Sequence, residues 1–466
     1  MERRVSDLIP TRRELLRLGG YGLLGSFADQ ALWPVRARAA GKANPRGTAR
    51  FCVLIELAGA ISHLDTFDFK ESEGTPKDLD VVPVRNELYL SRRLFPELSR
   101  EMHRVSIVRS MKSHEVVHFR GQYYTQAGRP LNPAQAPEIP SVGAVIGHEL
   151  EAGRRESDTF PTYVGCNLDT SGCGALSTGF LHPRHSVLDV NLKTSIGGTA
   201  VEGEALELLG ERFRLLGELD RVMASGREGR DRAFGSFRDF QRSAFRILGD
   251  ARWSRAFRMT PEERERYGDN EVGLGCMLAR NLVLADAGTR YVHVVHPDWD
   301  HHKNIFHHGS KSNHYVRCNE FDRALACLMR DLAAAPSPRA PGKNLLDETL
   351  IVVATEFGRT PGPLNGVQGR HHYNQAYLSL FAGGGVKGGR IIGKTDSGGH
   401  QVVESGWRYS KMQPKTENVY ATIYSALGID WKKEITNTPS RRAYRYVDVL
   451  GATEFVIDDE IADLFV

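Results

Sequence analysis

Short apolar runs alternate with longer amphipathic stretches along most of this chain. The runs of strand length are 51–58, 105–110, 289–295, 349–355 and 376–382. Apolar residues recur with helical spacing over 271–288, 315–335 and 417–428. Strands that are apolar throughout, rather than alternating with polar residues, are typical of a sheet buried on both faces. The pattern therefore predicts an α/β protein with a mostly parallel central sheet sandwiched by helices.

Domain organisation follows from the same pattern. The 466 residues are enough for one large domain or two ordinary ones. We expect one α/β domain over 40–466, because no linker-like tract interrupts the alternation. Residues 203–257 differ from the rest, with helical apolar spacing and dense surface charge, and they predict a helical insertion.

The first 39 residues have the features of an export signal. Arg12 and Arg13 form a twin-arginine pair, a weakly apolar and Gly-rich stretch follows, and 37–39 reads Ala-Arg-Ala, as at a cleavage site. A basic amphipathic helix is the alternative. We expect twin-arginine (Tat) export with the Tat translocon as partner, a periplasmic or secreted location, and no transmembrane anchor in the mature chain.

Charge and cysteine content narrow the function further. The net charge is only +4 and no basic block stands out, so nucleic acid is not an expected partner. Of the six cysteines, Cys166 and Cys173 flank a loop-like segment and could form a disulfide in an oxidising compartment. Buried free thiols are the simpler interpretation for most of the six.

Polar residues of metal-ligand type lie at the ends of several predicted strands. Imidazole and carboxylate groups are frequent metal ligands, and sites in parallel sheets form at the carboxyl ends of strands. The histidine-rich segment 293–314 follows one strand. The candidate ligands, taken over all these strands, are His63, Asp65, Asp300, His302, Glu356 and His372.

Each candidate also has an ordinary structural explanation. His63 could be a hydrogen-bonded structural histidine, His372 part of a surface loop, and Glu356 an ion-pair partner of Arg359. His293 points along a strand and is expected to be structural. The coincidence of so many ligand-type residues at one sheet edge nevertheless predicts a shared metal site.

Several stretches then give the chain a family resemblance. They are the twin-arginine segment from Thr11, LAGAISHLDTFD, VRSMKSHEVVHFRGQYYTQAG, DWDHHKN, ATEFGRTP and GRHHYNQAYLSLFAGGGVKGGRIIG. Together they resemble the Tat-exported bacterial family known as domain of unknown function 1501. That family is itself distantly similar to the alkaline phosphatase, sulfatase and cofactor-independent phosphoglycerate mutase superfamily. The resemblance implies an alkaline-phosphatase-like fold.

The superfamily resemblance also implies roles for individual residues. Two divalent ions, with Zn or Mn best suited to mixed nitrogen and oxygen ligands, would clamp a phosphoryl or sulfuryl group. Ser113 resembles the nucleophile, His118 would lie nearby, and Arg359 would hold the non-bridging oxygens. Ser62 and Ser110 are alternatives for the nucleophile, and Ser113 could instead cap a helix.

The departures from the superfamily pattern leave the function open. Phe357 stands where a metal-binding His is usual, and Ala58–Ile61 stand where the closer family often has Asn-Gly-Gly-Pro. No sulfatase Cys- or Ser-x-Pro-x-Arg signature occurs. We expect an exported metal-dependent hydrolase of phosphate or sulfate esters, acting on small molecules or polysaccharides. The alternatives are a non-catalytic metal- or partner-binding protein and a transferase that uses the same site.

Overall fold

A large mixed sheet organises the computed structural model, which describes residues 37–39, 42–85, 87–192, 204–224, 243–449 and 456–465. Its strands, in spatial order, are β13 (Ile391–Ile392), β5 (Val105–Met111), β12 (Tyr377–Ala382), β9 (Thr349–Ala354), β2 (Phe51–Leu57), β8 (Tyr291–His296), β6 (Tyr163–Cys166) and β7 (Leu188–Val190). Neighbouring strands are parallel except where β12 meets β5 and β9. The predicted α/β class with a mostly parallel sheet is confirmed.

The antiparallel direction of β12 has a consequence for the site. Tyr377, the first residue of β12, pairs with Met111, the last residue of β5. The start of β12 therefore lies at the edge of the sheet where the parallel strands end. Residues just before β12 can meet residues that follow β2, β8 and β9.

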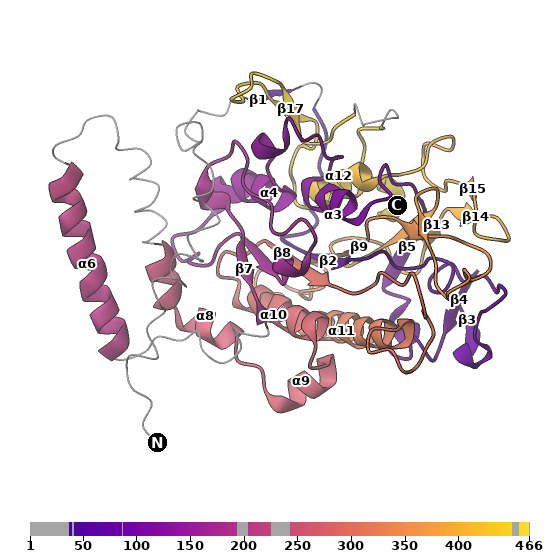
Figure 1. The fold of residues 1–466 in the computed structure, drawn as a ribbon. Helices are drawn as coiled ribbons and strands as arrows, with labels where there is room; N and C mark the ends of the chain where they lie inside the picture. Colours follow the sequence, from indigo (N-terminus) through magenta and orange to yellow (C-terminus); the bar gives the residue numbers. More distant parts are fainter. Residues whose placement is uncertain are drawn as a thin grey trace.

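Helices cover both faces of the sheet (Figure 1). One face carries α10 (Glu271–Ala285) and α11 (His314–Ala334), and the other carries α3 (His118–Ala127), α4 (Val142–Leu150) and α12 (Thr416–Ala426). Side chains of β2 alternate between the two cores, Val53 and Ile55 joining the first and Cys52 and Leu54 the second. This double burial explains why the strand sequences are apolar throughout.

The remaining helices and strands lie outside the main sheet, and all of them except the helix Glu204–Ala224 are short. They are α2 (Leu98–Glu101), α6 (Glu204–Ala224), α8 (Ala251–Ala256), α9 (Pro261–Tyr267), β1 (Ala37–Ala39), β3 (Val81–Arg85), β4 (Leu88–Ser91), β10 (Gly358–Arg359), β11 (His372–Tyr373), β14 (Lys394–Thr395), β15 (Val402–Glu404), β16 (Lys433–Ile435) and β17 (Tyr444–Arg445).

Most predicted elements are present, and the loop-rich segment 160–200 also contains two short strands that the sequence did not predict. Its Gly, Ser and Thr content predicts loops, yet it supplies β6, beside β8, and β7, the last strand of the sheet. Both are short. Pairing of β6 with β8, and of β7 with β6, holds them in the sheet more than local propensity does. Cys166 lies in β6, and both it and Cys173 are free thiols, so the disulfide that their spacing allowed is not formed.

The two predicted peripheral segments are described only in part. Within the predicted insertion the structure describes α6 and α8, while 225–242 lies outside the described residues. The predicted signal also falls outside them, apart from β1, which pairs with β16. Across the described ranges, no helix is long and apolar enough to cross a bilayer.

The buried His185, which packs against the half-buried His148, predicts how stability responds to acid. Burial lowers the pKa of His185 to about 3, and the ring of His148 lies against it with centroids 5.5 Å apart. The unfolded chain, with a His pKa near 6.5, binds more protons between these values, so unfolding becomes easier as pH falls below 6.5. His185→Gln should flatten this dependence by ~3 kcal/mol between pH 7 and 4, measured by urea unfolding. His103→Gln, at an exposed histidine, is the control, and equal slopes for both variants would contradict the assignment.

Candidate metal centre

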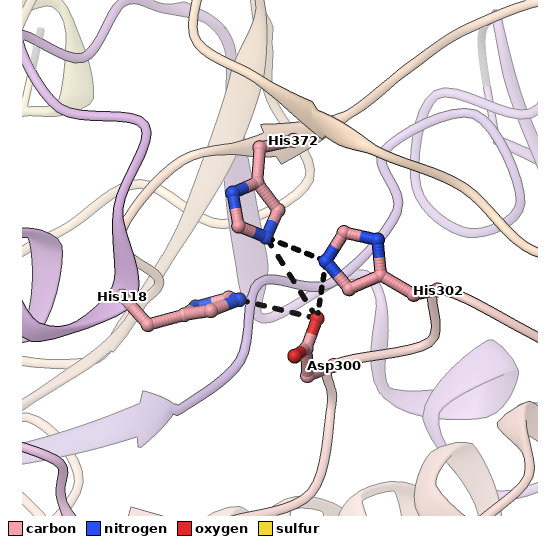
Figure 2. A group of neighbouring side chains, drawn as sticks. All are labelled: His118, Asp300, His302 and His372. Atoms are coloured by element: carbon pink, nitrogen blue, oxygen red, sulfur yellow. Dashed lines mark hydrogen bonds and ion pairs between the residues drawn. The ribbon is translucent and has the colours of Figure 1, made fainter.

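Four side chains converge at the sheet edge where the parallel strands end (Figure 2). They are His118, Asp300, His302 and His372, and each offers one ligand atom within 4.8 Å of the others. His118 opens α3, Asp300 and His302 follow β8, and His372 begins β11 just before β12. Three segments distant in sequence therefore supply one group. The polar residues at strand ends predicted three of its four members, Asp300, His302 and His372.

The distances within the group are those of atoms around a common centre. Asp300 Oδ1 lies 3.1 Å from His118 Nε2, 3.2 Å from His302 Nε2 and 3.9 Å from His372 Nε2. The Nε2 atoms of His302 and His372 are 2.8 Å apart. Three imidazole nitrogens and one carboxylate oxygen form a donor set typical of Zn²⁺.

The outer hydrogen bonds fix which ring nitrogen faces inward. His118 Nδ1 donates to Glu356 Oε2 at 2.9 Å, and His372 Nδ1 donates to the Val116 carbonyl at 2.6 Å. In the neutral rings, Nε2 then carries a lone pair directed at the Asp300 carboxylate and at the other rings. Lone pairs facing a carboxylate repel unless a cation or proton lies between them. The residues present therefore fit a metal ion, with the outer acceptors orienting the ligands.

Glu356 is the acceptor behind His118. Its side chain is fully buried, Oε1 accepts from Gly59 N at 2.6 Å and from Gln122 Nε2 at 3.1 Å, and Oε2 accepts from His118. Gly121 lets α3 approach, because a Cβ at that position would lie 2.8 Å from Glu356 Cβ. Both oxygens face donors of the protein, so the structure places Glu356 behind a ligand instead of among the four.

Arg359 holds Asp300 from the other side. Its Nη2 donates to Asp300 Oδ1 at 2.6 Å, and its other donors reach the carbonyls of Gly59, Ala60 and Arg370. The guanidinium is 1% exposed. Each of its nitrogens already donates a hydrogen bond to an acceptor of the protein. The predicted contact with non-bridging substrate oxygens would require Arg359 to give up one of these partners.

The hydrogen-bond partners of Asp300 and His118 set the charge of the four-residue group. Partial burial alone would raise the pKa of Asp300, but the hydrogen bonds from His118, His372 and Arg359 outweigh it and hold that pKa well below its usual value. Burial alone would lower the pKa of His118, yet its bonds to Asp300 and Glu356 raise it to about 9. The site favours an anionic Asp300 and a positive charge beside it.

The structure does not bring His63 and Asp65 into the group. His63 Nε2 donates to the Gly399 carbonyl at 2.9 Å, and Asp65 forms a fully buried ion pair with Arg370 at 2.6 Å. Arg370 in turn precedes the β11 segment, so this pair fixes the loop that carries His372. Among the residues that the structure describes, the four-residue group is the one cluster suited to a metal ion.

The predicted serine nucleophile lies in a buried turn. Ser113 Oγ accepts from Glu115 N at 3.1 Å. It is not a helix cap, because α3 begins at His118 with Val117 in the capping position. Ser110 Oγ donates to the Ser405 carbonyl at 2.6 Å. Ser62 is buried as well. None of the three belongs to the four-residue group.

Three other histidines of the segment 293–314 make contacts within the fold. His293 Nε2 bonds to Glu56 Oε2 at 2.8 Å inside the sheet, as expected for a strand residue. His301 Nε2 donates to the Ser312 carbonyl at 2.6 Å, and the buried His314 ring packs against Trp299.

Phe357 is fully buried, with its ring centroid 5.1 Å from that of His118 and 4.9 Å from that of His372. It forms an apolar wall behind two of the ligands.

A strained residue lies next to the site. Ala60 has φ +68°, in the left-handed region that favours Gly. Its carbonyl accepts from Arg359, which holds it there. Ala60→Gly should stabilise the protein by ~1 kcal/mol in chemical unfolding. Gly59→Ala should do the opposite, because its Cβ would lie 2.6 Å from Asp300 N. Destabilisation by Ala60→Gly would contradict the strain.

The chain is similar to several solved structures and matches one family model. Solved structures to which the chain is similar include a Vibrio parahaemolyticus protein in the alkaline phosphatase superfamily (11% identity, 91% of this chain and 76% of that one, TM-score 0.35), the Listeria monocytogenes lipoteichoic acid synthase LtaP (9%, 86% and 77%, 0.39) and the Silicibacter pomeroyi phosphonate monoester hydrolase SpPMH (11%, 84% and 74%, 0.38). No curated protein sequence matches the chain. The model of a family described as "Protein of unknown function (DUF1501)" matches residues 49–454.

Proposed function

This chain belongs to the DUF1501 family, and we propose that it is an exported hydrolase of phosphate or sulfate esters that uses a divalent metal ion held by His118, Asp300, His302 and His372. The convergence of these four side chains at the sheet edge carries the proposal. Export rests on the twin-arginine segment at Arg12 and Arg13.

One ion fits the described residues better than two. His63, Asp65 and Glu356, the other predicted ligands, already have protein partners. Three imidazoles and one carboxylate suit Zn²⁺ better than Mg²⁺, with Mn²⁺ as the alternative. Such an ion supplies positive charge that polarises an ester and makes water a better nucleophile.

The protein's own residues prepare the site for this chemistry. Glu356 and the Val116 carbonyl orient His118 and His372. Arg359 keeps Asp300 ionised and in place, and Phe357 excludes water from behind the rings. The side chains of Asp300 and His302 remain 44% and 40% exposed, which leaves an open side from which a substrate can approach.

A non-catalytic metal-binding protein is the second candidate, and two observations favour it. Four protein ligands can complete a tetrahedron, as in structural zinc sites, whereas catalytic sites keep a position open. Arg359 and Ser113 are also engaged in internal hydrogen bonds. A transferase that uses the same residues would differ from a hydrolase only in the acceptor.

Metal analysis combined with turnover separates these candidates. We expect purified protein to contain about one Zn²⁺ per chain by elemental analysis, and to hydrolyse p-nitrophenyl phosphate or sulfate. Chelation should abolish hydrolysis and Zn²⁺ should restore it. A stoichiometric metal with no turnover of either ester would favour the non-catalytic candidate. Turnover that appears only with added alcohol acceptors would identify a transferase.

A further inference from the structure

Exposed apolar side chains surround the metal ligand His118 in the sequence. Val116, Val117 and Phe119 are 44%, 52% and 51% exposed, although Val and Phe are usually buried. Three such side chains within four residues form a concentration of exposed apolar surface that soluble proteins usually reserve for binding.

This segment, 116–119, is part of the wall of the site. The Val116 carbonyl accepts from His372 Nδ1, and Val117 occupies the residue position just before the helix that begins with His118. The backbone of the segment is therefore held by the same contact that orients His372, and its apolar side chains are attached next to the ligand His118.

The charges next to the segment cancel one another. Glu115 and Arg120 form a two-pronged ion pair, with Arg120 Nε 2.7 Å from Glu115 Oε2 and Arg120 Nη2 3.0 Å from Oε1. The charges of Glu115 and Arg120, on either side of the segment, are therefore paired with each other and do not favour a charged substrate group at this position. Val367 is a further exposed apolar residue, at 59%. Its carbonyl accepts from the backbone N of Asn304, two residues after His302, at 3.0 Å.

We propose that segment 116–119 binds the apolar group of the substrate, so that the ester is one of an alkyl or aryl alcohol. The charged head of such an amphiphile would reach His302 and Asp300 while its apolar part covers Val117 and Phe119. This inference rests on the proposed function for the identity of the head group. The apolar contact itself can be measured by binding.

Binding of an alkyl phosphate series tests the contact independently of turnover. Zinc-loaded full-length protein is titrated calorimetrically with methyl and with hexyl phosphate, below any micelle concentration. A fully buried methylene strengthens binding about fourfold, and a half-buried one about twofold, so hexyl phosphate should bind about 30-fold more tightly. Val117→Ser with Phe119→Ser should remove most of that difference and leave the methyl phosphate affinity unchanged. Val403→Ser, at an exposed valine on β15, is the matched control.

Each alternative outcome has a distinct meaning. Equal affinity for both phosphates, or a chain-length effect that survives the double substitution, overturns the inference. A shift in oligomeric state in the double variant, seen by gel filtration, would assign the segment to contact with a second copy and also overturn it. If hexyl phosphate binds selectively but no ester is hydrolysed, the apolar contact stands and the proposed hydrolase activity fails.

Discussion

Replacing Asp300 with Ala is expected to lower the Zn²⁺ affinity of the protein by more than about 100-fold, since loss of a partner that only orients a ligand already costs 10- to 100-fold. Asp300 is the one carboxylate of the group, and its Oδ1 approaches all three histidines. The change also leaves the buried Arg359 guanidinium without its counter-charge. Competition with a chelating dye would measure the affinity.

The stability of the same variant gives an independent readout. Removing one partner of a buried ion pair costs ~3–5 kcal/mol, and the partial exposure of Asp300 reduces this to about 2 kcal/mol. Asp298→Asn is the matched control, because Asp298 is exposed two residues away and its φ of +67° suits Asn. Unchanged Zn²⁺ affinity in Asp300→Ala would remove the metal centre and the function built on it.

The position of the site was predictable because strand ends are visible in the sequence. Apolar runs fixed β2, β8, β9 and β12, and the polar residues beside them marked one edge of the sheet. Asp300, His302 and His372 are predicted as ligands in this way, and the structure brings their side chains together. His118 was expected only as a neighbour of the nucleophile, and the strand ends gave no signal for it because it opens a helix.

What the sequence left undetermined was the direction of each side chain. His63 and Asp65 follow β2 as a ligand pair would, yet they bond to Gly399 and Arg370. Glu356 follows β9 and lies at the right edge, but three donors from other segments occupy its oxygens. Such donors come from residues more than 200 positions away in the chain, so local patterns contain no information about them.

The role of Glu356 can be decided by experiment. As the acceptor behind His118, it should affect metal binding without changing the set of ligands, so Glu356→Gln should lower Zn²⁺ affinity 10- to 100-fold. Glu356→Ala should in addition cost ~3 kcal/mol of folding stability, because Gly59 N, Gln122 and His118 would lose a buried acceptor. Chelator competition and urea unfolding measure the two effects.

The absorption spectrum of the Co²⁺-substituted protein distinguishes an orienting residue from a ligand. Glu356→Gln should keep the visible d–d bands of the parent protein, since the same four atoms would surround the ion, while the affinity falls. Glu56→Gln is the matched control, because Glu56 is also a fully buried carboxylate bonded to a buried histidine, His293, outside the group. A loss of band intensity in Glu356→Gln alone would make Glu356 a ligand, as the sequence first predicted, and would require its side chain to leave Gly59 and Gln122 when metal binds.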